Sequence, residues 1–139
     1  MSEKDLAVLC AAIEPEMASP VYVYCSFPDF SLPAGLPPLF TFREAEGLTA
    51  VIDLLDAERY DLPYTFKARL ITLKVQSSLE AVGFLAVVSA HLATAAIPCN
   101  AIAGYHHDHI LVPVEQADEA FSVLERISGS STHRLSGIV

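Results

Sequence analysis

The chain has 139 residues, of which 53% are hydrophobic and 18% charged, and its formal net charge at pH 7 is −9. This length fits one domain or two small halves packed together. The negative charge, with the eight Lys and Arg residues scattered, argues against nucleic acid and anionic membranes as partners. So apolar a chain is expected to hide surface in an oligomer, or to carry helices buried on more than one side.

The chain start and the cysteines indicate a cytoplasmic protein. The first residues are polar and acidic, with no basic stretch before an apolar run, so no secretory signal is expected. The longest apolar segment, 81–97, is too short to span a membrane. Three widely spaced cysteines without a C-x-x-C pair fit reduced thiols better than disulfides or a zinc site; they are Cys10, Cys25 and Cys99.

The N-terminal half alternates short helices and strands. Its spacing predicts a helix over 5–13, strands over 21–27, 39–44 and 48–53, and one or two helical turns over 54–60. The stretch 28–38 contains four prolines and is predicted to be a loop. A short joint at 63–67 divides the chain into an N-terminal half, 1–64, and a C-terminal half, 65–139.

The C-terminal half has the clearer pattern. It predicts a strand over 69–76, a helix from Ser77 or Ser78 to about Ala95, a hairpin of 99–105 with 109–114, and an amphipathic helix over 115–128. The tail from about 129 is small and polar, and we expect it to be flexible. The helix ending at Ala95 is apolar almost all round, so it needs a second cover from the other half or another subunit.

Four segments carry a resemblance to a known family. They are T-F-R-E-A-E-G-L-T (41–49), S-S-L-E-A-V-G (77–83), C-N-A-I-A-G-Y-H-H-D-H (99–109) and I-L-V-P-V-E-Q-A-D-E-A (110–120). Together they resemble small bacterial ACT-domain proteins, and the chain is similar also to the ACT modules of eukaryotic cytosolic amino-acid sensors. The resemblance implies an α+β fold of two tandem ferredoxin-like ACT-type βαββα modules, the first degenerate, with mixed or antiparallel sheets covered by helices. It also implies binding of an amino acid or other small molecule for regulation.

The candidate ligand site combines the predicted helix start with the strand start at 99–102. Free N–H groups at a helix N-terminus are a seat for a carboxylate, and an Asn amide can both donate and accept. The candidate ligand-binding residues are Ser77, Ser78, Leu79, Glu80, Cys99, Asn100 and Ile102. In the alternative, the serines only cap the helix and Asn100 only caps a turn.

Two glycines stand inside predicted elements. The most familiar regulatory ACT domains carry a glycine in the loop before the first helix, whereas here Ser77 and Ser78 occupy that loop and Gly83 falls inside the predicted helix. A close approach of a neighbouring element would explain Gly83. Gly104, in the strand, indicates a bulge or a close backbone approach.

The cluster His106-His107-Asp108-His109 contains side chains that can hold a metal ion. Neighbouring residues of a strand point to opposite faces, however, and a turn at His107-Asp108 would itself explain the aspartate. We therefore predict no metal site, and treat His106, His107 and Asp108 as secondary ligand contacts. Arg43, at a charged turn of the first half, is a further secondary contact.

No motif of a nucleophilic hydrolase, a zinc protease or a phosphate-binding loop is present. The leading hypothesis is a non-enzymatic regulatory protein without a cofactor, which binds an amino acid or related metabolite and forms a homodimer or higher homo-oligomer. One alternative is a protein-interaction module with no small ligand. The other is a metal-dependent hydrolase built on 106–109.

Overall fold

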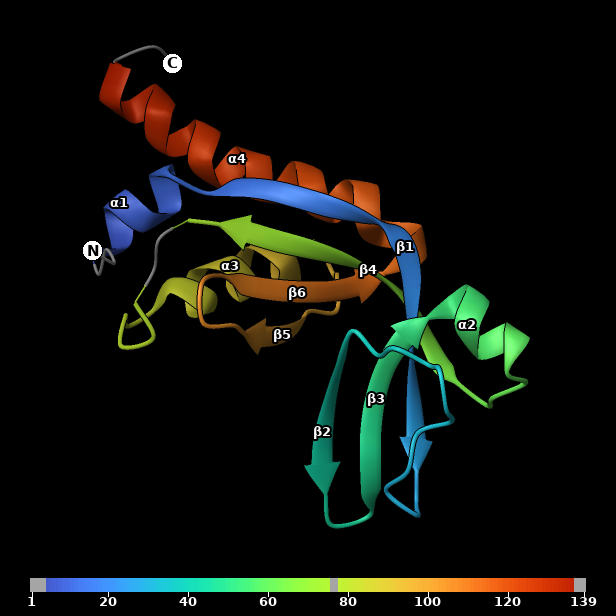
Figure 1. Cartoon of the computed structure of the whole chain (residues 1–139). Helices are drawn as coiled ribbons and strands as arrows, with labels where there is room; N and C mark the ends of the chain where they lie inside the picture. Colours follow the sequence, from blue (N-terminus) through green and yellow to red (C-terminus); the bar gives the residue numbers. More distant parts are fainter. Residues whose placement is uncertain (1–4, 76–77, 137–139) are drawn as a thin grey trace. The chain divides into compact units, whose positions relative to one another are not determined.

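The computed structural model of this protein describes residues 5–75 and 78–136, with side chains up to residue 129. The chain forms two compact units, which can be found in Figure 1 from the colours that mark residue number. One unit is the continuous segment Ser19–Arg69, and the other combines the two segments that flank it. Among the described residues, no helix has the length and apolar character that crossing a membrane requires.

Two long strands contribute to both units. They are β1 (Glu14–Phe27) and β4 (Thr65–Lys74). Both are longer than the sequence pattern predicts, because β1 begins seven residues before Val21 and β4 begins within the stretch interpreted as a joint. Pro15 lies inside β1, and it is tolerated there because the strand is at the end of the strand order in its unit, where one edge needs no partner.

The unit Ser19–Arg69 has the strand order β2-β3-β1-β4, to which β4 contributes its first five residues. Its remaining elements are β2 (Phe40–Glu44), β3 (Gly47–Asp53) and α2 (Leu54–Arg59). β1 pairs antiparallel with β3, from Tyr22 opposite Asp53 to Phe27 opposite Leu48. The Asp53 carboxylate caps α2 by accepting the Leu55 N–H at 2.8 Å, so the turn into this helix follows from the sequence.

The core of this unit comes from alternate positions of its strands, from α2 and from the proline-rich segment 28–38. Its buried members are Val23, Cys25, Leu36, Ala50, Ile52 and Ala57. The proline-rich segment 28–38 is irregular, as predicted, and the Tyr60 hydroxyl holds it by donating to the Ala34 carbonyl at 3.1 Å. The strands and the short helix predicted over 39–60 are confirmed.

The second unit has the strand order β1-β4-β6-β5. Its remaining elements are α1 (Leu6–Ala11), α3 (Phe84–Thr94), β5 (Asn100–Ala103), β6 (Asp108–Pro113), a 3₁₀ turn (Val114–Gln116) and α4 (Ala117–Ser136). β6 lies between β4 and β5, so the connection through α3 is a split βαβ unit. The N-terminal part of β1 completes the sheet beside β4.

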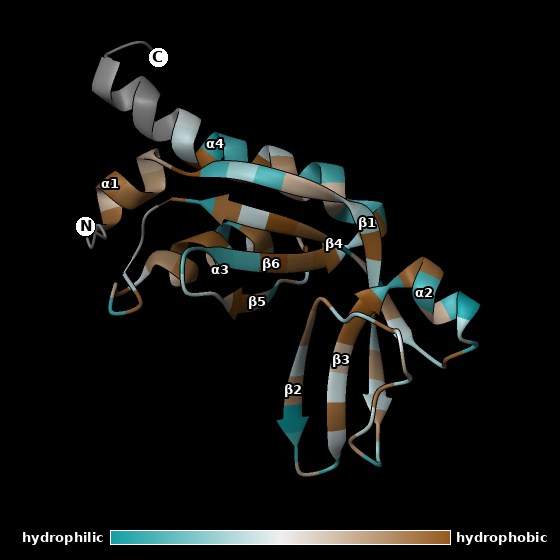
Figure 2. Ribbon diagram, viewed as in Figure 1, coloured by the Kyte–Doolittle hydropathy of each residue, from teal (hydrophilic) through white to brown (hydrophobic). Residues whose placement is uncertain are grey.

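Helices α3 and α4 lie on one side of β4 and β6 (Figure 1). The core between helices and strands is formed by apolar residues that are at most 8% exposed. They are Leu9, Cys10, Ile13, Ile71, Leu73, Phe84, Val88, Leu92, Ile97, Ile110, Val112, Ala117, Ala120, Val123, Leu124 and Ile127. In Figure 2, α4 alternates hydrophilic and hydrophobic colours, as an amphipathic surface helix does. It continues to Ser136, past the predicted end at 128.

The predicted α+β class is confirmed, and so are the hairpin β5–β6 and the amphipathic helix that follows it. The predicted start of the helix before this hairpin is wrong. α3 begins at Phe84, six residues after Ser78, and this shift decides where the candidate site lies.

Candidate functional site

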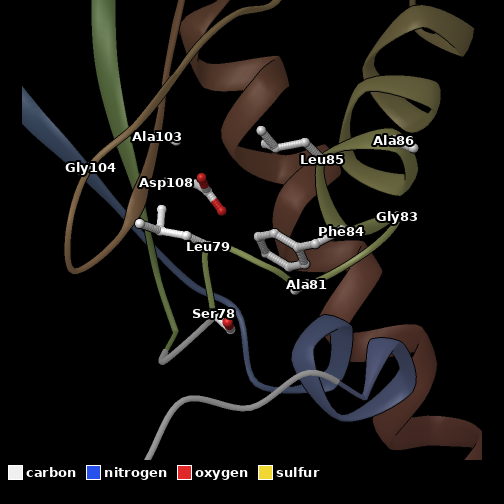
Figure 3. Close-up of a pocket in the computed structure, with 10 residues that line it drawn as sticks. All are labelled: Ser78, Leu79, Ala81, Gly83, Phe84, Leu85, Ala86, Ala103, Gly104 and Asp108. Carbon is white, nitrogen blue, oxygen red and sulfur yellow. The ribbon is translucent and has the colours of Figure 1, made fainter.

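A cavity of about 200 Å³ lies beside the first turn of α3. Two chain segments form it: the stretch from Ser78 into α3, and the end of β5 with the start of β6 (Figure 3). The residues that line it are Ser78, Leu79, Ala81, Gly83, Phe84, Leu85, Ala86, Ala103, Gly104 and Asp108.

The segment before α3 is a turn and not a helix. The Ala81 N–H donates to the Ser78 carbonyl at 3.0 Å, and the Ser78 hydroxyl accepts the Glu80 N–H at 3.0 Å. Gly83 then takes a left-handed conformation with φ +91°, which an L residue adopts only at a cost. Because a left-handed residue cannot continue a right-handed helix, α3 begins directly after Gly83. Gly83 therefore occupies the loop before the helix, where the most familiar regulatory ACT domains have their glycine.

The turn between β5 and β6 forms the opposite wall. The Gly104 N–H donates to the His107 carbonyl at 2.9 Å and closes the turn. A Cβ atom on Gly104 would lie 2.9 Å from that same oxygen and 3.1 Å from Nε2 of His109. The predicted close backbone approach at Gly104 is thus confirmed, and it places the next residue after the turn, Asp108, at the cavity.

The charges around the cavity have opposite signs on its two walls. The Asp108 carboxylate points into the space bounded by Leu79, Phe84 and Leu85 (Figure 3). The N-cap residue of α3 is Gly83, which has no side chain to cap the helix, and the N-terminus of the helix carries a partial positive charge. In Figure 2, β6 changes from hydrophilic at its first residues to hydrophobic beyond them.

His109 follows Asp108 on β6 and contacts β4. Its Nδ1 lies 3.0 Å from the Thr72 hydroxyl on β4. Burial lowers the pKa of His109 below its usual 6.5, the neighbouring His107 adds to this, and the Asp108 carboxylate opposes it. This histidine therefore helps to fix β6 against β4 and is not one of the residues lining the cavity.

The histidine cluster does not converge on one point. His106 stacks edge-on against Tyr105, with 5.0 Å between ring centroids, whereas Nδ1 of His107 lies 3.4 Å from the Val75 carbonyl. Within residues 5–75 and 78–136, no group of three or more His, Cys, Asp or Glu side chains is placed to hold a metal ion. The metal-dependent hydrolase has no support in this turn.

Of the predicted ligand residues, Ser78 and Leu79 line the cavity, and so does Asp108 from the predicted secondary contacts. Ser77 lies outside the described residues. Glu80 lies in the turn next to Leu79 but is exposed and does not line the cavity. Arg43 belongs to the other unit, where its guanidinium stacks on the Phe30 ring 4.7 Å from the centroid.

The three candidates from the start of β5 do not line this cavity; they are Cys99, Asn100 and Ile102. The premise that Asn100 lies beside the start of the helix is wrong. The chain leaves the end of α3 at Ala95 and enters β5 five residues later, so the strand start lies near the helix end. The residues of β5 that reach the first turn of α3 are at the other end of the strand, Ala103 and Gly104.

Sequence reasoning missed the apolar lining. Phe84, Leu85 and Ala86 lie in the first turn of the true helix, and Ala103 lies at the end of β5. The signals that could have located them are the two glycines, Gly83 and Gly104. Each marks a backbone position that only glycine fits easily, and both lie on the cavity wall.

Comparisons with known proteins identify the family of this chain. ACT-domain models match residues 1–69 and 65–126 of the chain. A Vibrio cholerae protein of unknown function, described as a possible transport protein, is 39% identical over 90% of this chain and 97% of its own, with a TM-score of 0.80. This chain belongs to the ACT-domain family.

Two further structures share the fold of this ACT-domain protein at low identity. An Agrobacterium tumefaciens protein is 16% identical, with a TM-score of 0.70 over 84% of this chain and 89% of its own. The regulatory subunit of aspartate kinase from Thermus flavus is 8% identical, with a TM-score of 0.54 over 83% and 95% of the two chains. Among curated proteins, no sequence matches this chain. The expected tandem of ferredoxin-like ACT modules is confirmed by the two successive family matches.

Proposed function

We propose that this ACT-domain protein is a non-enzymatic regulatory protein, and that it binds a free amino acid or a closely related zwitterion in the cavity beside α3. The observation that carries the proposal is the pairing of a carboxylate with an uncapped helix start across one small cavity. A zwitterionic ligand presents the complementary charges a few bonds apart.

The α-carboxylate of the ligand accepts hydrogen bonds from the backbone N–H groups of the first turn of α3, which include those of Phe84 and Leu85. The hydroxyl of Ser78 lines the same cavity and adds a donor. The α-ammonium group pairs with the Asp108 carboxylate on the facing wall. Each charged end of the ligand thus has a fixed partner on a different element.

The remaining walls select the ligand by size and polarity. The volume of about 200 Å³ is below the roughly 300–1,000 Å³ of sites for drug-sized molecules, so a single small metabolite fits. Leu79, Phe84 and Leu85 offer apolar contacts to its side chain. The site therefore suits an α-amino acid with a short aliphatic side chain better than one with a second charge.

The absence of a catalytic arrangement supports a regulatory role. The cavity-lining side chains with polar atoms are Ser78 and Asp108, and no histidine, lysine or cysteine lines the described walls. A serine without a neighbouring base is a weak nucleophile. The similarity to a regulatory subunit of aspartate kinase supports the same role by analogy of fold.

The test is a thermal-shift screen against the common amino acids, followed by titration calorimetry. A ligand at 100 times its Kd stabilises the folded state by about 2.7 kcal/mol, which a melting curve detects. The N-acetyl and the amide derivatives of the best ligand should each bind more weakly, because each lacks one of the two charges. No response to any amino acid would overturn the proposal.

The variant Asp108→Asn tests whether the ligand binds in this cavity or elsewhere on the protein. Loss of a charge-assisted hydrogen bond is worth about 1.5–3 kcal/mol, so Kd should rise about 10- to 100-fold. The matched controls are Glu80→Gln, an exposed carboxylate of the adjacent turn, and Asn100→Ala at the far end of β5; both should keep the affinity of the unaltered protein. Equal losses in Asp108→Asn and either control would place the ligand elsewhere.

A further inference from the structure

Helix α3 carries no Asp, Glu, Lys or Arg residue on any face, although one face is open to solvent. The exposed positions are small or weakly polar: Ala86, Ser89, Ala90, Ala93 and Thr94, together with His91. A surface helix of a monomer normally presents charged residues on such a face. The neighbouring α4 does so, with Asp118, Glu119, Glu125 and Arg126 exposed. The exposed face of α3 therefore has the composition of a helix face that another part of a protein covers.

A groove of about 510 Å³ runs between the exposed sides of α3 and α4. The residues that line it are Ala90, His91, Thr94, Ala95, Val123 and Arg126. Ala90, Thr94 and Ala95 on the α3 side are small and allow another helix to approach that side closely, at the lower end of the 8–10 Å range of helix packing. The shape of this surface fits a helical layer.

The charges on α4 identify which helical layer fits. Glu119 and Arg126 are both exposed and lie seven residues apart, which places them on one face of the helix, two turns from each other. The ion pairs found among the described residues are Arg59–Asp56 and Lys74–Glu16, so neither Glu119 nor Arg126 is paired within its own chain there. If two copies of α4 pack antiparallel about a twofold axis midway between Glu119 and Arg126, each residue of one copy faces the oppositely charged residue of the other.

We propose that a second copy of this chain covers the α3–α4 face through a twofold axis that passes near Ser122. The two α4 helices cross antiparallel, so Arg126 of each copy faces Glu119 of the other, and the small residues of the two α3 helices close the groove. The proposal is independent of the ligand cavity, whose lining includes neither α4 residue. The low charged fraction of the chain, 18%, fits a protein that buries this surface in a dimer.

The experiment measures the mass in solution by sedimentation equilibrium on the full chain, across about 1–100 μM. The unaltered protein should be a dimer. Arg126→Glu places two acidic residues opposite each other, and Glu119→Arg places two basic ones, so each should weaken self-association at least 10-fold. The double variant Glu119→Arg/Arg126→Glu restores opposite charges and should restore the dimer. Glu125→Arg, on α4 about 100° away from Arg126, is the control and should leave the mass unchanged.

A steric variant keeps the test decisive if one charge variant fails to fold. Ala90 is exposed in the groove, so Ala90→Glu should give a folded monomer, with folding checked by its thermal melt. A monomer at 100 μM for the unaltered protein would overturn the proposal. A dimer that survives Ala90→Glu and both single charge variants, or a double variant no stronger than the singles, would overturn it equally.

Discussion

Replacing Gly83 by alanine distinguishes two positions for the start of α3. If the helix began at Ser78, as the capping pattern predicts, Gly83 would lie in the helix interior. Alanine there would stabilise the protein by about 1 kcal/mol, because glycine is the poorer helix former. In the structure, Gly83 is the residue before the helix and has φ +91° and ψ −6°. The same substitution then acts in the opposite direction.

The magnitude follows from backbone conformation alone. A Cβ atom on Gly83 would meet Cδ2 of Leu6 at 3.5 Å, an ordinary contact, so no steric repulsion adds to the effect. A left-handed conformation costs an alanine about 1–2 kcal/mol. The reduced freedom of the unfolded chain returns about 0.4–1 kcal/mol. The net expectation is a loss of about 1 kcal/mol, or roughly 3–5 °C in Tm for a chain of this size.

Urea unfolding followed by circular dichroism measures the change. The control is Ala86→Gly, at an exposed position inside α3, which should cost about 1 kcal/mol if this residue is helical. An unchanged m-value in both variants would show that the native surface is retained. A Gly83→Ala variant more stable than the unaltered protein would refute the left-handed assignment, and with it the cavity beside the first turn of α3.

Two further predictions concern the hairpin. Because burial lowers the pKa of His109 below 6.5, the unfolded chain takes up this proton first as the pH falls, so stability contributed by the neutral ring is lost below about pH 6.5. His109→Asn should therefore lose less stability than the unaltered protein between pH 7.5 and 5.5 in urea unfolding. Parallel pH profiles for His109→Asn and the unaltered protein would contradict this. Gly104→Ala should lower the stability by about 1–3 kcal/mol at constant pH, because its Cβ meets the His107 carbonyl oxygen at 2.9 Å, and a neutral effect would mean that the turn is looser than described.

The elements with a strong periodic pattern could be predicted from the sequence. The alternation of Ile71, Leu73 and Val75 indicates the strand β4, and a period of 3.6 indicates the helix α4; both elements are present in the structure. The extension of β1 back to Glu14 could not be predicted, because two prolines interrupt its pattern. Pro15 is acceptable because this part of β1 is at the edge of the sheet of its unit, and that position depends on pairing with β4, more than fifty residues along the chain.

The start of α3 could not be predicted because serine acts alike in two structures. At a helix N-cap its hydroxyl accepts an N–H two or three residues ahead, and in a serine turn it accepts the N–H two residues ahead. Ser78 accepts the N–H of Glu80 at 3.0 Å, which fits either case. The apolar Leu79 and Val82 then extend the helical pattern backwards, although they are 70% and 85% exposed in the turn. Gly83 differs from the serines because glycine is disfavoured inside a helix, and it therefore indicates that the turn, and not the helix, extends to this residue.

The topology of the split βαβ unit explains why the start of β5, with Asn100, does not lie beside the start of α3. A helix that connects two strands returns along the sheet, so its start lies near the end of the second strand and not near the beginning. With the start of α3 as one wall, the partner must come from Ala103, Gly104 and the turn that follows. Asp108 is the first residue after that turn, opposite Ala103 in the hairpin register. If the proposed ligand site is correct, ligand recognition should therefore depend on Asp108 more than on Asn100 at the strand start.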